Sequence, residues 1–387
     1  MKDFQYLQQK YLVSTYPNRG LTFTRGSGAY LYNQSGEKYL DMMSNYGVNI
    51  FGYHHLFIHR ALVDQLERLS TLHCSFNSDI RANAAEKLIK RCGGNLSQVY
   101  FSNSGAESIE AALKFAVLAT GKKKFIACHQ AYHGKTLGAL SATSGDKYKK
   151  QFSPLLWDFQ HINYNSISDL KNAVDKNTAA FIVEPLQGEG GVIVPDQHYL
   201  KEVRKVCDAS GVLLILDEVQ TGTGRTGYFL ASHLQKINYD IVCLGKGLSG
   251  GIPIGATLVN QKVAGKIAKL IHSSTFGGNP LACAGILAVL ELLDQKTLDS
   301  VHRIGDYFIN QLKTIRSPQI KQVRGVGLMI GIEVSGDRNQ VLKELQSNKV
   351  LAIPAGDNVI RLLPPFIITQ KEVDIFIETF KICVASS

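Results

Sequence analysis

The chain has 387 residues, of which 45% are hydrophobic and 19% are charged, and this balance is typical of a globular protein rather than a disordered one. Its formal net charge is +10, but the basic residues are dispersed and the one tight run covers residues 122–124. We therefore expect an attraction for small anionic substrates and no nucleic-acid partner. No apolar run approaches the ~20 residues that span a bilayer, and the first residues lack a signal-peptide pattern, so no membrane partner is expected.

Residues 1–45 are punctuated by glycines and are expected to be extended, packing on a smaller domain or on a partner subunit. Residues 46–290 are expected to form a large domain, because short apolar segments there alternate with helical patterns. The expected strands are 98–101, Lys124–Cys128, 179–183, 212–216 and Ile241–Leu244. Their near-continuous apolar character predicts an α/β fold, with a mainly parallel sheet covered by helices on both faces.

The pattern changes after about residue 280, and residues 291–387 are expected to form a small α+β domain. Two helices are expected over 281–294 and 300–315, followed by one half-exposed antiparallel strand over 322–334. Two capping boxes mark further helix starts: Ser104 with Glu107 after the first strand of the large domain, and Thr369 with Glu372 before the last helix.

The seven cysteines are scattered and include no CxxC pair, so we expect reduced thiols in the core of a cytoplasmic protein. No metal site is expected. His54 and His55 are adjacent, but no second cluster of ligands accompanies them, and they have no assigned role.

Four segments carry the residues suited to chemistry. Asp217 directly follows one expected strand, and Lys246, flanked by glycines, follows another. Ligands of open α/β sheets bind outside the carboxyl ends of strands, and a lysine among apolar walls is more readily a neutral, nucleophilic amine. The segments 103–106, at a helix start, and 273–280, with hydroxyls beside glycines, could each bind an anion.

Each feature alone also fits an ordinary role: an acid at a strand end, a lysine in a turn, or a glycine-rich loop. Pyridoxal phosphate requires them together, because it needs a lysine to hold it, an acid against its pyridine nitrogen and a cradle for its phosphate. Their joint occurrence predicts a pyridoxal-phosphate site.

The sequence resembles the class III aminotransferases from about residue 21 to the last helix. The resemblance is carried by the segments 216–222, 224–227 and 245–247, with 131–136, 183–191 and 274–280 around them. It implies a fold-type I pyridoxal-phosphate transferase that forms a homodimer with shared active sites.

The resemblance also implies individual roles. Lys246 would hold the cofactor and shuttle the proton, and Asp217 would pair with the pyridine nitrogen. The remaining cofactor contacts would come from Ser104, Gly105 and Ala106 at the phosphate, Tyr132 and Val219 on the two ring faces, Gln220 at the ring hydroxyl, and Thr275 of the other subunit at the phosphate.

Substrate contacts are expected from Lys135, Glu184, Ser274 and Arg361. The resemblance implies that Arg361 binds a substrate carboxylate and that Glu184 neutralises it at other times, although a purely structural ion pair is the alternative. Acetylornithine enzymes usually have an arginine that grips the α-carboxylate where this chain has Lys135, and putrescine transaminases are more similar at this position.

These observations predict an ω-aminotransferase that moves the terminal amino group of acetylornithine or ornithine to 2-oxoglutarate, leaving a semialdehyde and glutamate. The alternatives are putrescine, 4-aminobutyrate or a lysine-pathway analogue as donor, and an aminomutase or decarboxylase that uses the same cofactor. A binding module without activity would have no need for Lys246, Asp217 and a phosphate cradle together.

Overall fold

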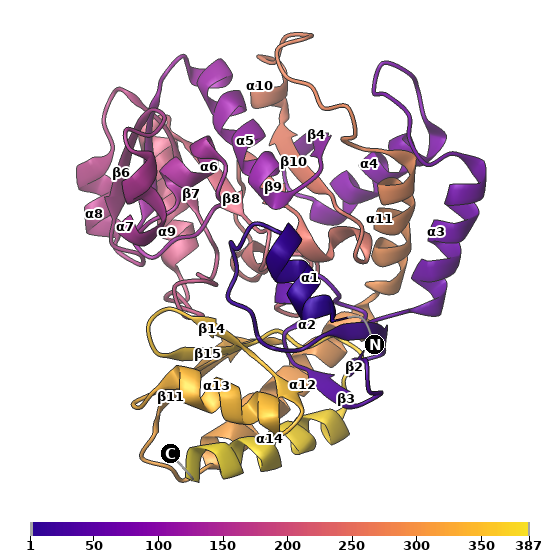
Figure 1. Cartoon of the computed structure of the whole chain (residues 1–387). Helices are drawn as coiled ribbons and strands as arrows, with labels where there is room; N and C mark the ends of the chain where they lie inside the picture. Colours follow the sequence, from indigo (N-terminus) through magenta and orange to yellow (C-terminus); the bar gives the residue numbers. More distant parts are fainter. Residues whose placement is uncertain (1–2, 386–387) are drawn as a thin grey trace.

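The computed structural model describes residues 3–385. Figure 1 shows a large upper part built around one sheet and a smaller lower part that contains the C-terminal helices. The large sheet has the strand order β4-β10-β9-β8-β7-β5-β6. Its strands are β4 (Leu96–Ser102), β5 (Lys124–Cys128), β6 (Asp158–Ile162), β7 (Thr178–Val183), β8 (Leu213–Asp217), β9 (Ile241–Leu244) and β10 (Gly255–Asn260).

The expected α/β fold with a mainly parallel sheet is confirmed. Strands β5 to β9 pair in parallel, whereas β10 runs antiparallel to both β4 and β9. Every position of β7, β8 and β9 is buried, which explains why these strands are continuous apolar runs rather than alternating ones.

Helices surround this sheet, and α5 (Gly105–Thr120), which comes shortly after β4, begins at the candidate site. The Ser104 hydroxyl accepts a hydrogen bond from the Glu107 amide at 3.2 Å, as the capping pattern predicts, while the Glu107 carboxylate accepts from the Asn103 amide. The helices of the large part are α3 (Leu56–Arg68), α4 (Asp79–Cys92), α5 (Gly105–Thr120), α6 (Leu137–Ala142), α7 (Asp146–Lys149), α8 (Ile167–Ala173), α9 (Tyr199–Ser210), α10 (Gln261–Ala264) and α11 (Pro280–Leu292), with 3-10 turns η1 (Lys150–Phe152), η2 (Ala231–Gln235) and η3 (Lys246–Ser249).

The C-terminal sheet has the order β11-β12-β15-β14. The single strand expected over 322–334 is wrong: two strands pair antiparallel there, separated by a turn at Gly327, whose φ of 57° suits glycine. The alternation of apolar with small or polar residues continues across this turn, so the sequence pattern does not reveal where one strand ends and the next begins. The elements are α12 (Gln295–Thr314), β11 (Ile320–Val326), β12 (Met329–Val334), α13 (Arg338–Ser347), β14 (Ile353–Ala355), β15 (Val359–Leu362) and α14 (Gln370–Ala385).

The N-terminal segment contains α1 (Phe4–Tyr11), β1 (Phe23–Ser27), β2 (Tyr30–Asn33), β3 (Lys38–Asp41) and α2 (Ser44–Gly47). Strand β3 pairs in parallel with β13 (Val350–Leu351), so this segment shares a sheet with the C-terminal part. The division at residues 45 and 290 stays a prediction, and its outermost residues 1–2 and 386–387 lie outside the described part of the chain. Between residues 3 and 385, no helix is both long and apolar enough to cross a membrane.

Candidate active site

Asp217 and Lys246 lie at the carboxyl ends of neighbouring strands. Asp217 ends β8 and Lys246 follows β9 after one glycine, and the two strands pair in parallel, so their ends meet at one edge of the sheet. Lys246 has a φ of 46°, in the left-handed region that non-glycine residues rarely adopt. Such backbone strain is characteristic of functional positions, and here it turns the lysine out of the line of its strand.

The Asp217 carboxylate is buried and firmly oriented. One oxygen, Oδ1, accepts a hydrogen bond from the Val219 amide at 3.0 Å, and the other, Oδ2, lies 2.7 Å from Nδ1 of His133. The His133 side chain is fully buried. The sequence alone suggested no role for His133, although this residue directly follows Tyr132 in the segment 131–136, which carries part of the family resemblance.

The Lys246 amine lies in a low-dielectric surrounding. Burial disfavours the ammonium form, and the positive charge of Arg361 adds to this effect, so the pKa of Lys246 falls to about 8. The carboxylates of Glu189, Asp217 and Glu184 act in the opposite direction but do not outweigh burial. The lowered pKa makes the neutral, nucleophilic amine more accessible near neutral pH than it is for an ordinary lysine.

The start of α5 packs closely against Val219 and against Gly245, which precedes Lys246. A Cβ atom added to Gly105 would lie 2.5 Å from Cγ1 of Val219, and one added to Gly245 would lie 3.1 Å from Cα of Gly105. Only glycines permit this close approach. The helix start that contains Ser104, Gly105 and Ala106 therefore stands against Val219, one of the two residues expected to cover the cofactor ring.

The loop 273–278 lies beside the same helix start. The Ser274 hydroxyl accepts hydrogen bonds from the Asn103 side chain at 3.1 Å and from the Gly277 amide at 2.9 Å. Ser274 therefore contacts the residue that precedes the start of α5, and its expected contact with substrate stays a prediction. The neighbouring Thr275 is exposed.

The expected pair of Glu184 and Arg361 is not formed, which corrects the sequence-based assignment. The Glu184 carboxylate accepts hydrogen bonds from the amides of Tyr132 at 3.0 Å and Gly188 at 3.1 Å. Burial raises the pKa of Glu184 to about 7. Glu184 therefore holds the backbone of Tyr132 and of the segment that follows β7.

Arg361 pairs with Glu189 instead. Its Nη2 lies 2.6 Å from Oε1 of Glu189, and its Nη1 donates to Oε1 of Gln220 at 3.0 Å. Burial would raise the pKa of Glu189, but the charge of Arg361 and its hydrogen bond keep that pKa below the usual value. Gln220 thus contacts Arg361, and its expected contact with the ring hydroxyl stays a prediction. A Cβ atom on Gly188 would clash with the Gln220 side chain.

Lys135 is exposed, and its ammonium lies 5.7 Å from the centroid of the Tyr148 ring. Tyr148 meets Tyr132 edge-on, with ring centroids 5.9 Å apart. Lys135 is therefore at the rim of the site, one aromatic ring away from Tyr132.

His54 and His55 lie apart from these residues. The His54 ring lies 4.8 Å from that of His59, and the His55 ring lies 5.6 Å from that of Phe51. Within residues 3–385, no cluster of His, Cys, Asp or Glu has the arrangement of a metal site.

The residues fit a pyridoxal-phosphate site. A buried acid, an amine with a lowered pKa, the close contact of Gly105 with Val219, and a helix start suited to a phosphate lie at one edge of the sheet. Fold and site together define a fold-type I pyridoxal-phosphate enzyme.

The comparisons with known proteins specify the family. The class III aminotransferase model matches residues 13–384. The chain is 40% identical over 378 residues to the acetylornithine aminotransferase of Methanopyrus kandleri, covering 96% of both chains. It is 43% identical over 360 residues to a Pyrococcus horikoshii protein provisionally named LysW-aminoadipate semialdehyde/glutamate semialdehyde transaminase, covering 93% of this chain and 94% of that one.

A solved structure agrees with these relatives. The ornithine aminotransferase of Toxoplasma gondii superposes with a TM-score of 0.95 at 34% identity, covering 99% of this chain and 94% of that one. The chain belongs to the class III aminotransferases and is a pyridoxal-phosphate-dependent transaminase.

Proposed function

We propose that this transaminase moves the terminal amino group of an ornithine-like donor, acetylornithine or ornithine, to 2-oxoglutarate, giving a semialdehyde and glutamate. The observation that carries the proposal is the buried Arg361, held by Glu189 near Lys246. The names of relatives such as the acetylornithine aminotransferase of Methanopyrus kandleri support the choice of donor.

The two substrates make different demands on Arg361. In 2-oxoglutarate a carboxylate adjoins the reacting carbon, and an arginine fork binds a carboxylate through two parallel hydrogen bonds. A terminal amine has no carboxylate at that place, and an unpaired buried guanidinium would then be costly. Glu189 can neutralise Arg361 for the donor and leave it free for the keto acid, which is the role that the sequence had suggested for Glu184.

Pyridoxal phosphate supplies an electron sink for the bond that breaks at the donor carbon. The chain positions the reactants around it. Lys246 would hold the cofactor, and its Nζ would then take the proton from the donor carbon and pass it to the cofactor. Asp217, oriented by His133, would pair with the pyridine nitrogen and keep it protonated. The N-terminal turn of α5 would bind the phosphate.

We also propose a homodimer in which the partner subunit's Thr275 completes the phosphate cradle. Exposed apolar side chains on α3, in the segment that follows it and over residues 270–276 support an interface that involves these elements, because exposed apolar patches commonly mark protein–protein contacts. They are Leu56, Phe57, Val63, Leu66, Leu69, Phe76, Leu270, Ile271 and Phe276. Seven free cysteines, of which only Cys74 is exposed, fit the proposed cytoplasmic location.

A second donor class is favoured by Lys135. Its exposed ammonium lacks the fork that would select an α-carboxylate, so diamines such as putrescine are candidate donors alongside acetylornithine.

The proposal is tested with a panel of amines and 2-oxoglutarate, scored for glutamate. Acetylornithine or ornithine should give the highest kcat/KM. Single-turnover measurements should then show that Arg361→Ala damages the 2-oxoglutarate half-reaction more than the donor half-reaction, and that Glu189→Gln does the reverse. Equal effects on both half-reactions would contradict the role given to this pair.

A further inference from the structure

Glu189 lies near the tip of a tight hairpin that links the two parts of the molecule. Gln187 and Ile193 pair through both backbone hydrogen bonds, at 3.1 and 3.0 Å, and so form the base of the hairpin. The Glu189 carbonyl accepts a hydrogen bond from the Gly356 amide at 2.7 Å, in the turn between β14 and β15. The backbone of Glu189 is thus tied to the small domain, and its carboxylate faces Arg361.

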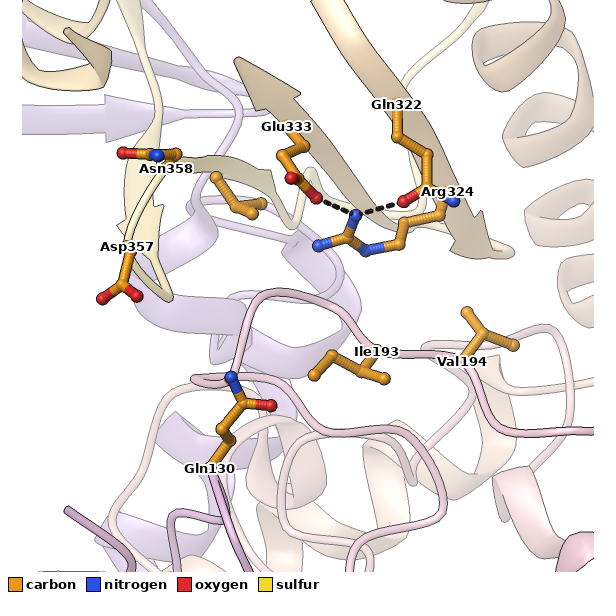
Figure 2. A pocket seen from close by; sticks show the side chains of 10 residues that line it. Gln130, Ile193, Val194, Gln322, Arg324, Glu333, Asp357 and Asn358 are labelled. Carbon is orange, nitrogen blue, oxygen red and sulfur yellow. Dashed lines mark hydrogen bonds and ion pairs between the residues drawn. The ribbon is translucent and has the colours of Figure 1, made fainter. Parts of the chain in front are cut away.

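The hairpin is held in a conformation that it would not adopt unaided. Val192 is fully buried with a φ of 54°, and a β-branched residue is a clear outlier in the left-handed region. The hairpin borders a cavity of about 560 Å³ instead of packed protein, and Gly190, Ile193 and Val194 line this cavity together with Gln322, Arg324 and Glu333 of the small domain (Figure 2). Few contacts are therefore available to hold the hairpin in place beside the cavity.

Arg324 of β11 supplies those contacts. Its Nε donates to the carbonyl oxygens of Gly191 and Val192 at 3.0 and 3.1 Å, and its Nη2 donates to Gly191 at 2.8 Å. The opposite edge of the guanidinium is fixed by Gln322 and Glu333, each 2.6 Å from Nη1, as Figure 2 shows. The arginine is thereby a rigid link between the hairpin and two strands of the small domain.

The strand beside Arg324 is shaped for the hairpin. Gly331 of β12 stands opposite Arg324 in the register of the two strands. A Cβ atom on Gly331 would lie 2.9 Å from Cβ of Val192 and 3.2 Å from the Gly191 oxygen. The absence of a side chain there allows the hairpin to approach the sheet closely enough for Arg324 to reach it.

We propose that Arg324 is a positioning residue, which fixes the hairpin so that the Glu189 side chain moves to and from Arg361 while its backbone stays in place. This inference rests on the proposed function, in which Glu189 neutralises Arg361 during the donor half-reaction. Without Arg324 the hairpin would relax, Glu189 would return to Arg361 less often, and the donor half-reaction would suffer selectively.

The test uses the cofactor-loaded enzyme with Arg324→Gln, and with Arg324→Lys as a milder variant that keeps the charge. Arg324→Gln should slow the donor half-reaction about tenfold, equivalent to ~1.4 kcal/mol, and change the 2-oxoglutarate half-reaction much less. Hydrogen exchange in residues 187–193 should rise. Arg324→Lys should also slow the donor half-reaction more than the 2-oxoglutarate half-reaction, but by a smaller factor.

Two comparisons isolate the mechanism. Arg204→Gln is the matched control, because Arg204 is a similarly buried arginine that joins Asp208 and Asp240 in the large domain, and it should show no bias between half-reactions. In a Glu189→Gln background, Arg324→Gln should add little to the loss in the donor half-reaction, since both changes act through one carboxylate.

The outcomes separate the two proposals. If Glu189→Gln alone shows no bias toward the donor half-reaction, the proposed function of the pair fails. If Glu189→Gln shows the bias but both Arg324 variants leave the donor half-reaction unchanged, or slow both half-reactions equally, the positioning role is overturned and the function of the pair stands.

Discussion

Nδ1 of His133 lies 2.7 Å from Oδ2 of Asp217, and both side chains are buried. The imidazole donates a hydrogen bond to a carboxylate whose other oxygen is already held by the Val219 amide. The Asp217 carboxylate is thereby held by two hydrogen bonds before any cofactor binds. No free energy of reorganisation is then needed to orient it during the reaction. In the proposed site, His133 would act on the ring nitrogen only through Asp217.

The first prediction concerns this pair. Asp217→Asn should retain the cofactor but lose most turnover, because removing one partner of a buried charge pair costs roughly 3–5 kcal/mol, or about two to four orders of magnitude in rate. His133→Asn should cost less, since a hydrogen bond to a charged group is worth about 1.5–3 kcal/mol. Turnover should be measured with the bound cofactor quantified by absorbance.

His233→Asn is the control for this prediction, because His233 is a partly buried histidine that bonds the Cys92 carbonyl in the large domain. It should leave turnover unchanged. If Asp217→Asn stays within tenfold of the wild type, another acid serves the ring nitrogen.

The second prediction follows from the pKa of Lys246, which burial lowers to about 8. Below that pH the amine is mostly ammonium, and above it mostly neutral, so the rate at which the cofactor-free protein takes up pyridoxal phosphate should rise with pH and level off above about 8. Arg361→Ala removes a charge that lowers this pKa and should shift the profile to higher pH. Glu189→Gln removes a charge that raises it and should shift the profile to lower pH.

A profile that keeps climbing toward pH 10 in the unmodified protein would show that Lys246 titrates like an ordinary surface lysine. The attachment site itself is checked by borohydride reduction and peptide mapping, which should find the label on Lys246 and on no other lysine.

The sequence revealed the residues that follow buried strands. Asp217 and Lys246 come directly after continuous apolar runs, and parallel strands bring such ends together, so their proximity follows from the pattern. Glu189 does not follow an apolar run, so the sequence pattern did not mark it. It lies in a glycine-rich hairpin without periodicity, and only the folded path of that hairpin decides that Glu189, and not Glu184, reaches Arg361.

Other features were hidden for similar reasons. The bond between His133 and Asp217 joins segments that are far apart in the chain, and neither segment encodes the other's position. The antiparallel direction of β10 depends on how the chain turns after Lys246, and apolar content does not distinguish the two directions.

The third prediction concerns Thr275. The side chain is exposed, while its neighbour Ser274 is bound to Asn103 in the same chain. If Thr275 serves the partner's site, mixing inactive Lys246→Ala chains with inactive Thr275→Asp chains should restore activity, because each hybrid dimer then contains one complete site. Recovery should be measured after hybrids have been isolated by differential tagging. Hybrids that form and stay inactive would assign Thr275 to the site of its own subunit.

The last prediction concerns the choice of donor, through Lys135. When a terminal amine meets the cofactor, the α-carboxylate of an amino-acid donor extends toward the rim of the site, where the exposed Lys135 ammonium lies near the ring of Tyr148. A lysine attracts a carboxylate as a point charge but lacks the bidentate geometry of arginine, so it discriminates less against donors without one. We therefore expect activity on acetylornithine or ornithine together with measurable activity on diamines.

Lys135→Ala should raise KM for carboxylate-bearing donors by about two- to fivefold, as expected for an exposed charge pair worth up to ~1 kcal/mol, and leave KM for putrescine nearly unchanged. Lys135→Arg should restore the fork and increase the preference for acetylornithine over putrescine. The control is Lys147→Ala, which removes a neighbouring exposed ammonium that also lies over Tyr148 and should change both donors alike. If Lys135→Ala harms putrescine and acetylornithine equally, Lys135 supports the structure of the rim and does not select the donor.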